Sequence, residues 1–102
     1  MAQARLLNPA GDLVGTLEGQ PTPEAILRLA YSLHKDDVLT GLLDGDQWRL
    51  GVIIMDQQPG GDVTRTFPQS VRADAMPAER VEGYLMELAL LDLWDRGWAL
   101  EA

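Results

Sequence analysis

The sequence contains no cysteine and a single histidine, His34. The lack of cysteine excludes a disulfide framework, thiolate zinc sites and a cysteine nucleophile, and it is typical of a reducing compartment. With one histidine, a zinc site would need carboxylates for most of its ligands, and a catalytic triad would have only His34 as its base. His34 falls near the end of a predicted helix, where we interpret it as a boundary residue.

Basic residues are also few, because 8 Lys and Arg stand against 16 Asp and Glu, giving a formal net charge of −8. Nucleic-acid binding gains affinity from clustered lysine and arginine that neutralise phosphates. The basic residues here are scattered, so we expect no direct contact with nucleic acid. Acidity usually serves solubility, and an acidic surface that mimics DNA is the alternative interpretation.

Long apolar runs are absent, and the longest are Val52 to Met55 and Leu88 to Leu91. A membrane-spanning helix needs about 20 apolar residues, so neither run is sufficient. The N-terminal stretch has no apolar core of the length that a secretion signal requires. We therefore expect a soluble, cytoplasmic protein with no membrane partner.

Motifs that would carry chemistry are missing as well. No glycine-rich phosphate-binding spacing occurs, and the aspartates do not follow the calcium-loop pattern. We interpret the aspartates as turn residues. They are Asp36, Asp37, Asp44, Asp46 and Asp56. Three arginines, Arg65, Arg72 and Arg80, could converge on an anion, although nearby acids favour solvated arginines. We expect no enzyme, catalytic residue, cofactor or metal.

Alternating and helical periodicities predict a single α+β domain over residues 1–102. Strands are expected over residues 4–8, 13–18, 38–43, 47–55 and 63–67, the last stopped by Pro68, with a further short strand at 98–101 left open. Asp44-Gly45-Asp46 suits a hairpin turn, with the glycine at positive φ. The segment from Gln57 to Met76 has three interpretations: a binding loop, an edge strand with its turns, or a flexible excursion.

Two helices are expected. Thr22 suits an N-cap and Pro23 the first helical position, so the first helix should run to about His34 or Lys35. The second should begin at Pro77 and end near Arg96, with Gly97 in the left-handed cap position.

The resulting order is β-β-α-β-β-(β)-α-(β), and the fold class is an antiparallel sheet of four to six strands with two helices on one face. A ferredoxin-like sandwich with an extra N-terminal strand requires the last strand to pair. Otherwise the chain forms two strand-pair-plus-helix halves of one sheet.

The second helix is apolar on two sides. One stripe is the expected sheet-facing set, Val81, Tyr84, Leu85, Leu88 and Leu91. The other is the candidate interface, Met86, Ala89, Leu90, Leu93 and Trp94. A helix that is apolar nearly all round must be buried on both sides, and exposed apolar patches usually mark interfaces. The loop from Pro68 to Met76 could cover the second stripe, and a second copy of the chain could cover it more fully.

The sequence therefore predicts a non-enzymatic, acidic interaction module, such as an adaptor, chaperone-like subunit or small regulator, acting as a homodimer through the outer face of its C-terminal helix. The alternative is a small-ligand binding or sensing domain. Its pocket would lie between sheet and helices, with an arginine selecting an anion. The pocket would be lined by Tyr31, Trp48, Met55 and Tyr84.

Overall fold

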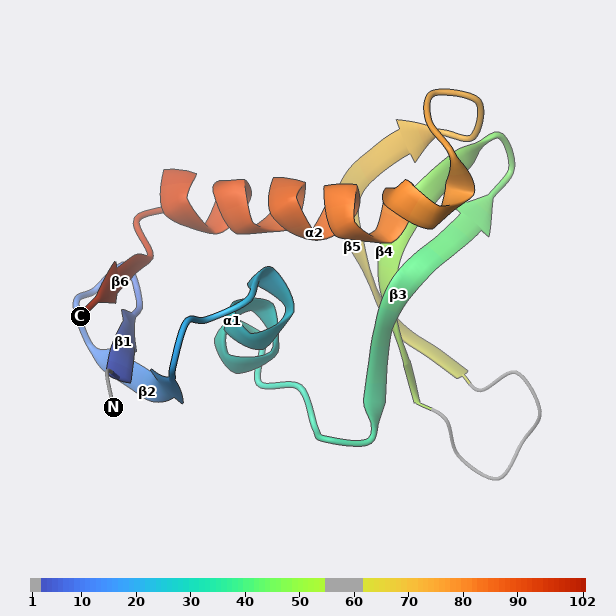
Figure 1. Cartoon of the computed structure of the whole chain (residues 1–102). Coiled ribbons are helices and arrows are strands. Elements are labelled where there is room, and N and C mark those ends of the chain that lie inside the picture. Colours follow the sequence, from blue (N-terminus) through green and yellow to red (C-terminus); the bar gives the residue numbers. More distant parts are fainter. Residues whose placement is uncertain (1–2, 55–61) are drawn as a thin grey trace. The chain divides into compact units, whose positions relative to one another are not determined.

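The computed structural model describes residues 3–54 and 62–102. These residues form two helices and six strands (Figure 1). In chain order they are β1 (Gln3–Leu7), β2 (Leu13–Glu18), α1 (Pro23–Ala30), β3 (Asp37–Asp44), β4 (Gln47–Ile54), β5 (Asp62–Arg72), α2 (Ala78–Asp95) and β6 (Ala99–Glu101). The predicted α+β class is confirmed. The expectations for Met55 and for residues 57–61 lie outside the described residues.

The six strands form two antiparallel sheets of three strands, with the orders β2-β1-β6 and β3-β4-β5. The prediction of one continuous sheet, which a ferredoxin-like sandwich also needs, is therefore corrected. The alternation of side chains along a strand fixes which residues share a face, but it does not fix which strand lies alongside. The last strand, whose pairing was left open, forms and lies beside β1.

The chain divides into two compact units. One combines Met1–Leu33 with Ala89–Ala102, and the other is His34–Leu88. Each unit contains one sheet and one part of α2. That residues 1–102 behave as a single domain stays a prediction.

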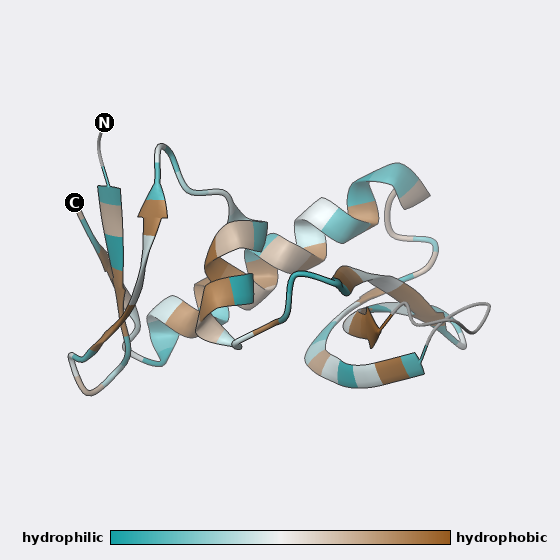
Figure 2. Ribbon diagram, turned by 90° about the horizontal axis from the view of Figure 1, so that it is seen from below, coloured by the Kyte–Doolittle hydropathy of each residue, from teal (hydrophilic) through white to brown (hydrophobic). Residues whose placement is uncertain are grey.

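In the first unit, β1 alternates between hydrophilic and hydrophobic residues (Figure 2). Leu6 is fully buried, while Arg5 points to the other face and pairs with Glu101 of β6 at 3.8 Å. Helix α1 packs closely on β2, since a Cβ built on Gly15 would lie 2.7 Å from a methyl group of Leu29. The absence of a side chain at Gly15 makes room for the Leu29 side chain in this close approach.

Helix α1 begins as predicted, because the Ala25 N–H donates to Thr22 Oγ1 at 3.1 Å. It ends at Ala30, earlier than the predicted His34 or Lys35. Ser32 adopts a φ of 55°, and the Leu33 N–H donates to the Arg28 carbonyl at 2.9 Å. This left-handed turn closes the helix without a glycine, so periodicity alone could not locate it.

In the second unit, β3 and β4 are joined at Gly45, whose φ of 63° confirms the predicted hairpin turn. Strand β4 lies in the centre of its sheet, between β3 and β5. Strand β5 continues past Pro68 to Arg72, so the prediction that Pro68 stops it is wrong. The pairing register between β4 and β5 shifts at this point, and β5 is an edge strand, where proline is tolerated.

The first part of α2 packs against this sheet. A Cβ built on Gly41 of β3 would lie 3.7 Å from Val81 and 3.9 Å from Leu85. Thr40 Oγ1 also donates to Glu82 Oε2 at 2.9 Å. At the other end, Gly97 has a φ of 102°, which confirms the predicted left-handed cap.

Candidate functional site

The candidate interface residues of α2 differ in exposure. Met86, Ala89 and Leu93 are buried within the single chain, whereas Leu90 and Trp94 are half-buried. Met86, Ala89 and Leu93 therefore need no partner to cover them, and the argument for an interface on this stripe rests on Leu90 and Trp94 alone. Whether a second copy covers the remaining part stays a prediction.

The stripe expected to face a sheet is divided as well. Val81 and Leu85 are buried, but Tyr84 is 41% exposed and Leu91 is 57% exposed. The buried arc of α2 is thus rotated from the predicted one, and it includes Leu93 in the later part of the helix.

His34 and Asp37 form a turn between α1 and β3. The His34 N–H donates to Asp37 Oδ2 at 2.9 Å, and the Asp37 N–H donates to the His34 carbonyl at 3.0 Å. Asp37 thus stabilises a turn, as interpreted from the sequence. Across residues 3–54 and 62–102, no group of three or more acidic or histidine side chains could hold a metal ion. Asp56 lies outside these ranges.

The three arginines considered as an anion site take different positions. Arg72 pairs with Asp74 at 3.0 Å, and Arg65 lies on β5. Arg80 lies in the first turns of α2 and lines a groove that includes neither of the other two. The arginines therefore do not converge.

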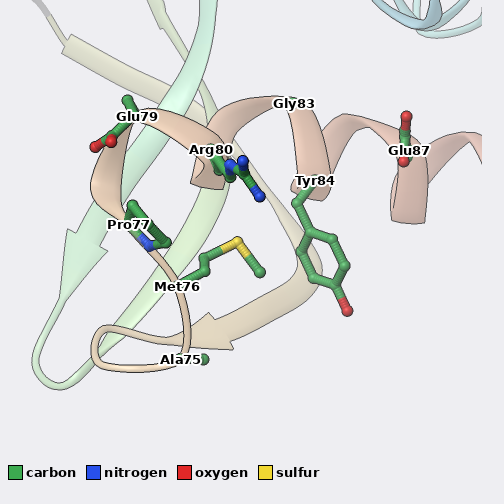
Figure 3. Close-up of a pocket in the computed structure, with 8 residues that line it drawn as sticks. All are labelled: Ala75, Met76, Pro77, Glu79, Arg80, Gly83, Tyr84 and Glu87. Carbon is green, nitrogen blue, oxygen red and sulfur yellow. The ribbon is translucent and has the colours of Figure 1, made fainter.

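This groove lies wholly within the unit His34–Leu88 and has a volume of about 610 Å³. It is lined by Ala75, Met76, Pro77, Glu79, Arg80, Gly83, Tyr84 and Glu87 (Figure 3). Its lining comes from the turn after β5 and one side of α2. We call it the α2 groove.

Figure 3 shows that the side chains of Met76, Arg80 and Tyr84 are directed toward a common space, while the carboxylates of Glu79 and Glu87 are turned away from it. Met76 is half-buried and Arg80 is exposed. Among the ion pairs of the described residues, none involves Arg80. The α2 groove thus offers one available cation between a thioether and an aromatic ring.

Gly83 forms part of the α2 groove in the middle of a helix. A Cβ added there would meet no atom within 4 Å, and its φ is not positive. Neither packing nor backbone conformation therefore requires glycine, although glycine inside a helix costs about 1 kcal/mol relative to alanine. Its effect on the structure is to leave this part of the groove open.

Of the four residues expected to line an aromatic pocket, Tyr84 is the one that lines either hollow of the described residues. Tyr84 lines the α2 groove, whereas Trp48 lies near Gly41 in the sheet of the same unit. Tyr31 belongs to the other unit, and Met55 lies outside the described residues. Met76 was not expected in a pocket; the signal that could have found the site is the spacing of Arg80 and Tyr84, which places them on one helix face.

A second hollow, of about 430 Å³, lies in the first unit. It is lined by Val14, Ala25, Arg28, Leu29, Ser32 and Leu33. Its one cation, Arg28, is already paired with Glu24 at 2.9 Å. This hollow therefore offers less free charge than the α2 groove.

The described residues thus form an α+β fold with an open groove of mixed polarity beside α2. No family model, curated protein or solved structure matches this chain. Neither helix of the described part is both long and apolar enough to cross a membrane.

Proposed function

We propose that this chain is a non-enzymatic interaction module, an adaptor, chaperone-like subunit or small regulator, that pairs with a second copy through the exposed side of α2. The observation that carries the proposal is Leu91, which is 57% exposed on a helix whose other apolar side chains are mostly enclosed. Transfer of a leucine side chain out of water is worth about 1.5–3 kcal/mol, so its exposure favours a partner.

Leu91 is not isolated. Leu90 and Trp94 are both half-buried and belong to the predicted interface. Residues three or four positions apart are neighbours on a helix surface, so Trp94 adjoins both leucines. We call Leu90, Leu91 and Trp94 the α2 apolar cluster. In this proposal the buried side chains of Met86, Ala89 and Leu93 hold the helix in the fold and do not contact the partner.

A second copy is the proposed partner because most soluble oligomers are homomeric with two-fold symmetry. A two-fold axis near the cluster would place apolar side chains against the same side chains of the other copy. Acidic residues at the margins, Asp92 and Asp95, would remain in solvent, and Asp92 already pairs with Arg96 at 2.9 Å.

Substitution of Leu91 by glutamate tests the proposal. Leu91→Glu should give a folded monomer, because it places a charge in the α2 apolar cluster without disturbing a buried side chain. The matched control is Leu43→Glu, since Leu43 is a leucine of nearly equal exposure, 58%, on β3. Sedimentation velocity at several concentrations should show dimers for the control and monomers for Leu91→Glu. Equal behaviour of the two variants would reject the helix as the interface.

A second proposal is that the chain binds a small molecule in the α2 groove. A volume of about 610 Å³ with a convergent arginine, methionine and tyrosine supports it. Ligand pockets typically have such volumes and combine apolar walls with few polar groups. Thermal-shift screening with metabolites tests it, because a ligand that binds the native state raises its melting temperature. No shift with any chemical class would contradict it.

A further inference from the structure

We propose that the α2 groove selects an aromatic carboxylate, and that Gly83 keeps the ligand's space open. This inference rests on the second proposed function, small-molecule binding, and adds the class of the ligand. The three features that carry it are the charge of Arg80, the walls formed by Met76 and Tyr84, and the open space over Gly83.

Arg80 supplies the selectivity for a carboxylate. A guanidinium donates in a planar fork that matches the two oxygens of a carboxylate. Arg80 makes no ion pair with the described residues, and Figure 3 shows it directed toward the space beside Met76 and Tyr84. The carboxylates of Glu79 and Glu87 are turned away, so they leave this side of the arginine accessible.

Met76 and Tyr84 supply the selectivity for an aromatic ring. Sulfur of methionine interacts favourably with ring edges, and two aromatic rings prefer offset or edge-to-face contacts. Tyr84 is 41% exposed and Met76 is half-buried, so both present free apolar surface to the groove. An aliphatic carboxylate would use the arginine but would lose these contacts.

Gly83 determines how much room the ligand has. It lies one residue before Tyr84 and three after Arg80, and a Cβ there would meet nothing within 4 Å. A long side chain at this position would therefore enter the groove without displacing any packed atom. The helix tolerates an unfavourable residue at the point where a side chain would obstruct binding.

The net charge of −8 opposes the approach of an anion. Such repulsion acts over distances of about the Debye length and is reduced by salt, whereas pairing with Arg80 acts at contact. We therefore expect weak binding whose affinity increases with ionic strength. The opposite dependence would be expected for a cationic ligand on this acidic chain.

The test uses three probes that share one ring, indole-3-acetate, 3-methylindole and tryptamine, titrated into the full chain and followed by the amide signals of Gly83 and Tyr84. Indole-3-acetate should bind more tightly than the other two. Arg80→Gln should weaken its binding about ten-fold, as expected for a lost charge-assisted hydrogen bond. The matched control, Arg72→Gln, should leave binding unchanged, because Arg72 lies outside the groove and pairs with Asp74.

Gly83→Met should abolish binding while the far-ultraviolet circular dichroism stays native, since the added side chain has open space. Several results would overturn the inference. If 3-methylindole or tryptamine binds and indole-3-acetate does not, the ligand class is wrong while the groove still functions. Equal binding to Arg80→Gln and to the native chain would remove Arg80 from the site. If no probe binds, both the inference and the proposed ligand binding fail.

Discussion

Gly51 and Gly83 both lie inside regular elements, β4 and α2, but their surroundings are opposite. A Cβ on Gly51 would lie 2.5 Å from a methyl group of Leu42 and 3.3 Å from the Arg65 carbonyl oxygen, whereas a Cβ on Gly83 would meet nothing. On the sheet, the leucine side chain occupies the space that a larger residue would need. On the helix, that space is open to the α2 groove.

The same substitution should therefore have opposite effects at these two positions. Gly83→Ala should raise the free energy of unfolding by about 1 kcal/mol through helix propensity. Gly51→Ala should lower it by about 1–3 kcal/mol, because Leu42 must leave its position. Urea denaturation of the two variants measures both changes. A destabilised Gly83→Ala would show that this glycine has a structural role.

Single-residue features that depend only on adjacent residues in the chain could be predicted from the sequence. The cap at Thr22 and the positive φ of Gly45 and Gly97 were foreseen, because each follows from the chemistry of one short segment. The left-handed Ser32 was not, since serine is uncommon in that conformation. The convergence of Met76 with Arg80 depends on how the chain turns before α2, which no local pattern specifies.

Within one helix, nearby positions should contribute very differently to the stability of the fold. Helix α2 carries Leu91, exposed, and Leu93, which is 1% exposed, two positions further on. Leu93→Ala should lower the free energy of unfolding by about 2–5 kcal/mol, the usual cost of emptying a buried leucine site. Leu91→Ala should change the monomer's stability by less than about 0.5 kcal/mol, as surface substitutions do.

Thermal and urea unfolding, at concentrations too low for association, measure the two leucine variants. Similar destabilisation by both would indicate that Leu91 is enclosed in solution, and the α2 apolar cluster could then not serve as a docking surface. A stable Leu93→Ala would place that side chain outside the core.

Element types were predictable from periodicity, but strand partners were not. The strands and both helices follow from alternation, from Pro77 and from the N-cap at Thr22. The division into two sheets depends on pairings between distant segments, such as β1 with β6. An edge strand was one of three interpretations of the segment that contains β5, but no sequence pattern indicated the shift in register that accompanies the continuation of β5 past Pro68.

At the scale of the whole molecule, two compact units are connected through one helix that has a part in each. If residues 1–102 form a single domain, both units should unfold together. Leu6→Ala and Leu50→Ala remove fully buried side chains from different units, and each should lower the stability of every slowly exchanging amide equally. Hydrogen exchange of β1 and β4 measures this. Destabilisation confined to the mutated unit would show two independent folding units.

Charge and apolar contact act in opposite directions on association. Each copy carries −8, so two copies repel one another, and the proposed contact through Leu90, Leu91 and Trp94 must overcome this repulsion. Salt screens the repulsion and leaves apolar burial intact. The proposed dimer should consequently become tighter as ionic strength increases.

Sedimentation equilibrium of the native chain at tens of micromolar, in low and in moderate salt, tests the proposed dimer most directly. The native chain should show a mass that approaches twice that of one chain, with a larger dimer fraction in moderate salt. A mass equal to one chain under both conditions would contradict the proposed dimer.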